Sequence, residues 1–224
     1  MDELRRSYHD RIGELRSQTS AIVLDASVAV ENVTAALLES DPVAARIVSE
    51  EVETSTGRAA AVESGVVELL ALQAPVARDL RIIVASLNIA QASALCLGLC
   101  RTLAAKAGGS AGLIITPQLR ALAYEMGAES ASLLAEANGA WSVLDEELAR
   151  QVIVKASGCR DLHRRFLTEL FGMSGVEVEA AVDLGMIARA YERMVDHIVD
   201  IAARVIYAET GTPPSETLAA LSSP

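Results

Sequence analysis

Hydrophobic side chains recur along most of this chain at the three- and four-residue spacing that is typical of amphipathic helices. The first stretch shows this spacing at Ile12, Leu15, Ile22, Val23, Ala26, Val30, Val33 and Leu37. Prolines at positions 42, 75, 117, 213 and 214 leave long intervening stretches that contain no proline. Because a proline inside a helix breaks or kinks it, these stretches favour long helices. The pattern therefore predicts an all-α protein.

Breaks in the pattern place the ends of six predicted helices. Asp41-Pro42 and Thr116-Pro117 each pair an N-cap residue with a proline in the first turn. Glycines 108, 109 and 112 predict a linker, whereas Asn138-Gly139 and residues 172–175 predict turns. The predicted helices cover residues 3–38, 42–73, 75–106, 117–138, 142–171 and 176–209. Residues 212–224 are rich in Pro, Ser and Thr, so we expect a flexible tail there.

An internal repeat relates the third predicted helix to the sixth. Residues 89–94 read Ile-Ala-Gln-Ala-Ser-Ala and residues 187–192 read Ile-Ala-Arg-Ala-Tyr-Glu, at an offset of 98. The six helices therefore fall into two groups of three that occupy equivalent places.

The sixth predicted helix carries an acidic stripe, formed by Glu192, Asp196 and Asp200 at four-residue spacing. Like charges at this spacing destabilise a helix unless a cation offsets them. One interpretation is a solvated, ion-paired face, because arginines stand three or four residues from each acid, at positions 189, 193 and 204. The acids also lie about 180° from the helix's apolar stripe. The other interpretation is that the acids ligate a metal ion.

Charge and composition limit the classes of function. The net charge is −11 and the pI is near 4.8, which argues against a nucleic-acid partner because phosphate contacts need clustered Lys and Arg. The amino terminus lacks the order of a signal peptide, and no uninterrupted apolar run approaches the roughly 18 residues that span a bilayer. We therefore expect a cytoplasmic protein without direct membrane insertion.

Catalysis finds little support in the sequence. A ferritin-like di-metal enzyme needs Glu-x-x-His pairs, but the residues three before His9, His163 and His197 are Arg6, Arg160 and Met194. Cys96 and Cys100 lie in an apolar helical pattern, where a free thiol usually behaves as a small buried hydrophobe. We expect a protein that is not an enzyme.

Three segments in order resemble the PhoU family of phosphate-uptake regulators: residues 72–81, which read Leu-Gln-Ala-Pro-Val-Ala-Arg-Asp-Leu-Arg, the acidic stripe, and residues 204–211, which read Arg-Val-Ile-Tyr-Ala-Glu-Thr-Gly. The resemblance covers nearly the whole chain to Gly211. It implies two tandem antiparallel three-helix bundles, here residues 1–110 and 111–211.

The resemblance also implies a function. Members of this family are cytoplasmic adaptors that damp phosphate uptake and the phosphate-starvation response. They contact the phosphate sensor histidine kinase and the ATPase of the phosphate ABC transporter, so this chain is expected to be peripheral to the inner membrane through its partners. A homodimer is a further expectation. The alternatives are a divalent-metal-binding helical protein and a structural scaffold without a phosphate role.

Some members of the family bind iron or other metal clusters through E/D-x-x-x-D motifs on the second and third helix of each bundle. In this chain only the motif at Glu192, Asp196 and Asp200 survives. The offset of 98 places Ala94, Gly98 and Thr102 at the matching positions of the third helix. The family motif of the second helix has its counterpart near Val52 and Thr56, with Glu53 nearby, and that of the fifth helix near Ala156 and Arg160. Because a hard cation takes about six oxygen ligands, we expect at most one weakly held divalent metal or iron ion at the acidic stripe. If the first bundle has lost its site, its exposed face is expected to serve a partner or a dimer.

Recognition residues of the adaptor are expected on the exposed face of the sixth helix, including Arg193, and around Arg78, Asp79 and Arg81.

Overall fold

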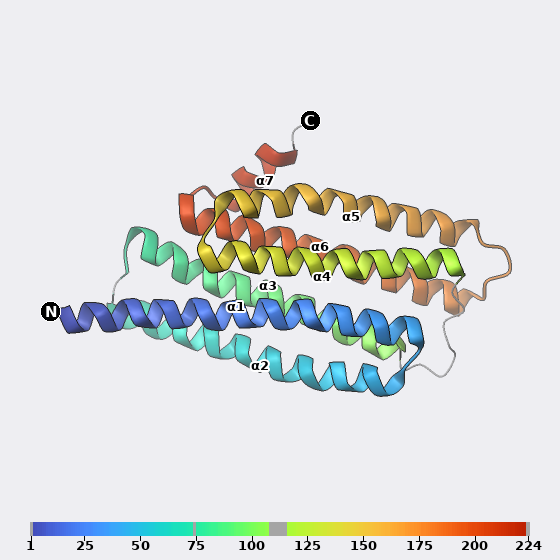
Figure 1. Cartoon of the computed structure of the whole chain (residues 1–224), viewed down its shortest axis with the longest axis horizontal. Helices are drawn as coiled ribbons and strands as arrows, with labels where there is room; N and C mark the ends of the chain where they lie inside the picture. The colour runs from blue at the N-terminus through green and yellow to red at the C-terminus, as the bar shows by residue number, and fades with distance from the viewer. Residues whose placement is uncertain (1, 74, 108–115, 223–224) are drawn as a thin grey trace.

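The computed structural model describes residues 2–73, 75–107 and 116–222, and every regular element among them is a helix. The elements are α1 (Asp2–Glu39), α2 (Pro42–Gln73), α3 (Ala77–Ala107), α4 (Pro117–Val143), α5 (Glu146–Gly172), α6 (Val178–Thr210) and α7 (Pro214–Ser222). The long helices lie side by side (Figure 1). The all-α prediction is confirmed, and α1 and α2 end within a residue of where the sequence placed them. The predicted glycine linker at 108–112 lies outside the described residues.

The predicted N-caps of α2 and α4 form as expected. The Asp41 carboxylate accepts hydrogen bonds from the backbone N–H groups of Val43 and Ala44, at 2.8 and 3.1 Å. The Thr116 hydroxyl accepts one from Leu119 at 3.2 Å. Each bond satisfies an N–H group that the first turn of a helix otherwise leaves without a partner.

The predicted end of α4 at Gly139 is wrong, because the helix continues to Val143. Trp141 lies in this last turn and is fully buried, and its indole N–H donates to the Arg16 carbonyl on α1 at 3.2 Å. Burial of so large a side chain outweighs the weak helix propensity of one glycine. The helix ends instead at Leu144, which adopts the left-handed conformation with φ 52°. Likewise, α3 begins at Ala77 and not at Pro75.

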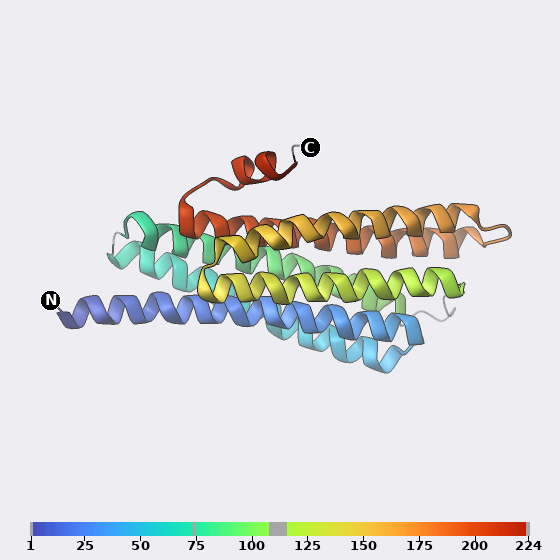
Figure 2. The ribbon, with the colours of Figure 1, turned by 45° about the horizontal axis from the view of Figure 1, so that its top comes forward.

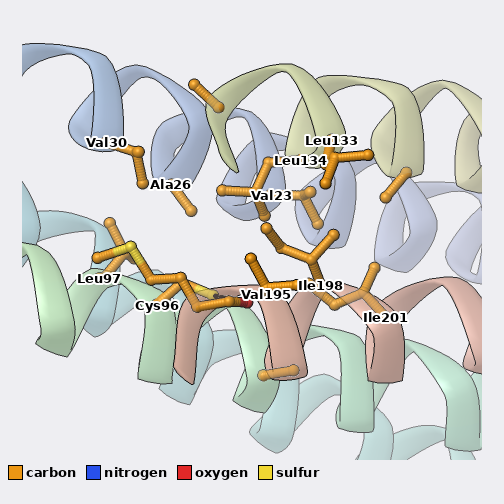
Figure 3. Close-up of a cluster of buried hydrophobic side chains, with 14 of the residues drawn as sticks. Val23, Ala26, Val30, Cys96, Leu97, Leu133, Leu134, Val195, Ile198 and Ile201 are labelled. Atoms are coloured by element: carbon orange, nitrogen blue, oxygen red, sulfur yellow. Dashed lines mark hydrogen bonds between the residues drawn. The ribbon is translucent and has the colours of Figure 1, made fainter. Parts of the chain in front are cut away.

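The helices form two groups of three that share one hydrophobic core. Within the first half α2 packs on α1 and α3, and within the second half α5 packs on α4 and α6. The halves meet through α1, α3, α4 and α6, with α2 and α5 on the outside (Figures 1 and 2). Side chains from all four central helices pack together there, including Val23, Leu97, Leu134 and Ile198 (Figure 3). Small and aliphatic residues supply this core, as the low aromatic content requires.

Buried polar contacts fix how α1 packs on the second half. The hydroxyls of Thr34 on α1 and Tyr191 on α6 are hydrogen-bonded at 2.8 Å, and Ser27 donates to the Ala131 carbonyl of α4 at 2.9 Å. Gly127 of α4 lies against Thr34, so close that a β-carbon added at Gly127 would come within 2.3 Å of the Thr34 hydroxyl oxygen. This glycine is therefore required by close helix packing.

The internal repeat has a direct counterpart in the interface between α3 and α6. The Cys96 thiol lies 4.0 Å from the carbonyl oxygen of Met194, and these two positions are separated by 98 residues, the repeat offset. When two halves are related by an approximate two-fold axis, equivalent positions near that axis contact each other, as Cys96 and Met194 do.

The segment predicted to be a flexible tail contains a helix, α7, which packs on α6. The Pro213 carbonyl accepts hydrogen bonds from the N–H groups of Glu216 and Thr217 and so starts this helix. Thr217 is 2% exposed, and Leu218 packs against the core. The composition of residues 212–224 does not predict these contacts. A short helix is stabilised mainly by the surface on which it packs, and composition does not reveal that surface.

Two helical stretches, Tyr8–Glu39 and Ala77–Ala107, are long and apolar enough to cross a membrane by length and composition. Their most apolar windows are 61% and 56% buried inside the protein. Both belong to the central layer where the halves meet, and core helices of this kind pass the same test.

Candidate functional site

The acidic stripe of α6 lies beside α5, and each of its three acids forms an ion pair. Glu192 pairs with Arg189, and Asp200 pairs with Arg204 at 3.3 Å, as the spacing predicted. Asp196 instead lies 3.9 Å from Arg160 of α5. The stripe is only partly solvated, since α5 covers one flank: the Glu192 side chain is 30% exposed, whereas that of Asp196 is 57% exposed.

The contact between α5 and α6 beside Glu192 is nearly closed. His163 Nε2 lies 3.7 Å from a Glu192 carboxylate oxygen, and Cys159 and Tyr191 line the same small cavity. Its volume is about 10 Å³, about the smallest space that holds one water molecule. The helices are thus closely packed beside Glu192, whose charge is offset by Arg189.

These residues do not fit a metal centre. Arginines occupy the immediate surroundings of all three carboxylates, and α5 contributes Ala156 and Arg160 at the positions where the family motif has acids. Among the described residues, no group of three His, Cys, Asp or Glu side chains converges in a way that could hold an ion. A hard cation needs more oxygen ligands than this helix face presents. Metal ligation by Glu192, Asp196 and Asp200 stays a prediction from the sequence.

The corresponding place in the first half is an open groove between α2 and α3. The predicted counterparts Val52 and Thr56 of α2 and Ala94 and Gly98 of α3 all line it. Its volume is about 510 Å³. The repeat thus relates the α3 side of this open groove to the face of α6 that carries the ion-paired acids.

Two arginines from different helices flank this groove, Arg101 of α3 and Arg193 of α6. Both are exposed, and neither forms an ion pair with another residue in the part of the chain that the structure describes. Glu53 is the one acidic side chain among the residues lining the groove. Sequence reasoning singled out Arg193 but missed Arg101, because only the packing of α3 on α6 brings them to one groove.

His197 of α6 also lines the groove and was missed as well. Its Nε2 atom is buried and has no hydrogen-bond partner among the described residues. Burial, with the nearby Arg193, lowers the pKa of His197, although Asp196 and Asp200 oppose the shift. The imidazole is therefore neutral at neutral pH.

The predicted recognition residues at the start of α3 have partners within the chain. Arg78 pairs with Glu209 at 2.5 Å, and Arg81 donates to the carbonyls of Ala208 and Glu209 at 3.4 and 3.1 Å. These bonds satisfy carbonyls in the last turn of α6 and tie its end to the start of α3. Asp79 lies near the Tyr8 hydroxyl. The pKa of Tyr8 is raised, mainly by burial and in part by the negative charge of Asp79. A role in binding partners remains a prediction for all three.

Comparison with known proteins identifies the family. The PhoU domain family model matches residues 123–205, which span most of α4 to α6. The chain is 34% identical over 221 residues to "phosphate-specific transport system accessory protein PhoU homolog 1" of Mycobacterium leprae, with 95% of this chain and 97% of that protein covered. It is 35% identical over 220 residues to PhoU homolog 2 of Mycobacterium tuberculosis, with 94% and 100% covered.

Solved structures show the same fold. The crystal structure of PhoU from Pseudomonas aeruginosa superposes with a TM-score of 0.82 at 21% identity, covering 92% of this chain and all of that one. PhoU from Streptococcus pneumoniae gives 0.79 at 20% identity, with 92% and 98% covered. Similarity over almost the full length of both this chain and its relatives shows that the chain belongs to the PhoU family.

Proposed function

We propose that this protein is a regulatory adaptor of phosphate homeostasis that limits phosphate uptake and the phosphate-starvation response. It acts in the cytoplasm by contacting the ATPase of the phosphate ABC transporter and the phosphate sensor histidine kinase. One observation carries the proposal: near-full-length similarity to relatives that are named as accessory proteins of the phosphate-specific transport system. Since a fold alone does not define a function, the names of these relatives carry more weight than the shared helical architecture.

The side chains support an adaptor over a catalyst. All three cysteines are buried, and burial raises the pKa of the Cys96 thiol to about 12 and that of the Cys159 thiol to about 11. Such thiols are protonated at neutral pH and are poor nucleophiles. The carboxylates of the acidic stripe form ion pairs with arginines. We therefore look for the function in surfaces that bind other proteins.

Phosphate uptake in cells that lack the gene tests this proposal. At high external phosphate, the initial rate of radiolabelled phosphate uptake should rise several-fold in the deletion strain. It should return to the parental rate when the full chain is supplied in trans. Unchanged uptake, together with an unchanged phosphate-starvation reporter, would contradict the proposal.

A further inference from the structure

The open groove between α2 and α3 is lined in part by small residues, which are called its floor below. Gly57 and Gly98 lie in helix interiors there, beside Thr56 and Ala94. A β-carbon added at either glycine would meet nothing within 4 Å apart from the glycine's own neighbours along the chain. Packing within the chain therefore requires neither glycine, although each disfavours its helix relative to alanine. A longer side chain at either position would extend into the groove that these glycines line.

The groove combines this floor with apolar and cationic surroundings. Leu95 of α3 lines it and is 51% exposed. Arg101 and Arg193 present guanidinium groups without an ion pair among the described residues, in a chain whose net charge is −11. A lone carboxylate, Glu53, leaves the lining net positive.

We propose that this groove binds an amphipathic helix of a protein partner, with its apolar face on the floor and aspartate or glutamate side chains paired with Arg101 and Arg193. An amphipathic helix typically lays its apolar face into such a groove between two helices. Small floor residues permit a close approach of backbones. Arginine forms bidentate pairs with carboxylates, which fix the register of the bound helix. The inference rests on the proposed function, since it gives the adaptor a surface for a partner that presents an acidic amphipathic helix.

The test measures binding of the full chain to the purified transporter ATPase and to the purified cytoplasmic part of the sensor kinase from the same organism. Gly98→Leu fills the groove with a residue that favours helices. Arg101→Glu with Arg193→Glu reverses its charge at exposed positions. Each change should weaken binding of one partner by at least about tenfold.

Matched controls separate the groove from general effects. Gly139→Leu makes the same change at an exposed glycine of α4, where an added β-carbon also meets nothing within 4 Å. Arg164→Glu with Arg165→Glu makes the same change in net charge on α5, where both side chains are exposed. Both controls should bind within about twofold of the wild type.

A photoreactive amino acid at Leu95 identifies the occupant. The cross-linked peptide should belong to the same partner, be predicted helical and contain Asp or Glu. Undiminished binding by the groove variants would overturn the inference and leave the proposed function standing. A cross-link to a second copy of this chain, or to a segment without acids, would also overturn it. No binding of either partner by the wild type would overturn both.

Discussion

The two halves of this molecule have the same helical arrangement but different surfaces at positions related by the repeat. In the second half, Glu192 and Asp196 lie beside α5 and form ion pairs with arginines. In the first half, the repeat-related positions are Ala94 and Gly98, and a groove remains open. The two halves thus share a helical arrangement while differing in the side chains of this partly exposed face.

Buried positions related by the repeat are more alike. Ile89 and Ile187 are related by the repeat, and both are almost completely buried. Cys96 and Met194, also related by the repeat, meet at the centre of the interface. Apolar burial is the dominant stabilising term of a fold, and both pairs supply buried side chains to the interface between the halves.

Substitution of glycines should give the largest differences in the free energy of unfolding, and Gly127 of α4 should show the largest effect. Gly127→Ala would place a methyl group against Thr34 and disturb its hydrogen bond to Tyr191. We expect the free energy of unfolding to fall by about 2–3 kcal/mol. Urea denaturation followed by circular dichroism measures this. A change of less than about 0.5 kcal/mol would show that the halves are not tightly packed there.

Gly98→Ala should have the opposite sign. The added β-carbon meets no other atom within 4 Å, and alanine favours the helix. We expect the free energy of unfolding to rise by about 0.5–1 kcal/mol in the same denaturation experiment. Gly139→Ala of α4 serves as the matched control, with a similar gain. A loss of stability confined to Gly98→Ala would mean that packing within the chain requires this glycine after all.

The pH dependence of stability tests the environment of His197, whose counterpart under the repeat is Leu99 (197 − 98 = 99). The pKa of His197 is lowered in the folded protein, mainly by burial. Below its unfolded pKa of about 6.5, the unfolded chain binds a proton that the folded one resists. Stability should therefore decrease as the pH falls from about 6.5 towards the folded pKa.

Denaturation of His197→Gln at the same pH values provides the comparison. The variant should lose less stability than the wild type over this window. Equal losses in the two proteins would assign the pH dependence to other groups.

The ion pairs of the acidic stripe should contribute least. The Asp200 side chain is 39% exposed and that of its partner Arg204 is 27% exposed, so solvent screens the pair. Asp200→Asn should lower the free energy of unfolding by no more than about 0.5 kcal/mol, and less at high salt. Urea denaturation at low and high salt measures this, and a loss well above 1 kcal/mol would contradict the assignment of the stripe as an ion-paired surface.

Metal analysis of the purified protein tests the acidic stripe of α6 further. The purified wild type and Asp196→Ala should have the same metal content, since the donor set of the stripe does not fit an ion. Metal that is present in the wild type and absent from Asp196→Ala would restore the metal-site interpretation.

Much of this structure could be predicted from local sequence patterns. Apolar spacing predicted six long helices, and proline with a preceding Asp or Thr predicted two of their starts. The continuation of α4 past Gly139 could not be predicted in this way, because it depends on where Trp141 packs against α1. The order of α7 likewise depends on the surface of α6 on which it packs, which the composition of residues 212–224 does not reveal.

The candidate sites show the same division. Spacing along α6 correctly indicated the pairing of Glu192 with Arg189 and of Asp200 with Arg204. It could not indicate that Asp196 lies nearest to Arg160 of α5. It also could not indicate that Arg81 bonds to the end of α6. Contacts within one helix follow from its geometry, whereas contacts between helices follow from the packing of the whole core.

Co-purification is the most direct test of the proposed adaptor function. The tagged full chain is isolated from its own cells, grown with and without excess phosphate, and the proteins that accompany it are identified. We expect recovery of the phosphate transporter's ATPase or the phosphate sensor kinase, in an amount that changes with phosphate. Recovery of neither in both conditions would contradict it, and would mean that this chain has kept the PhoU fold without the phosphate function.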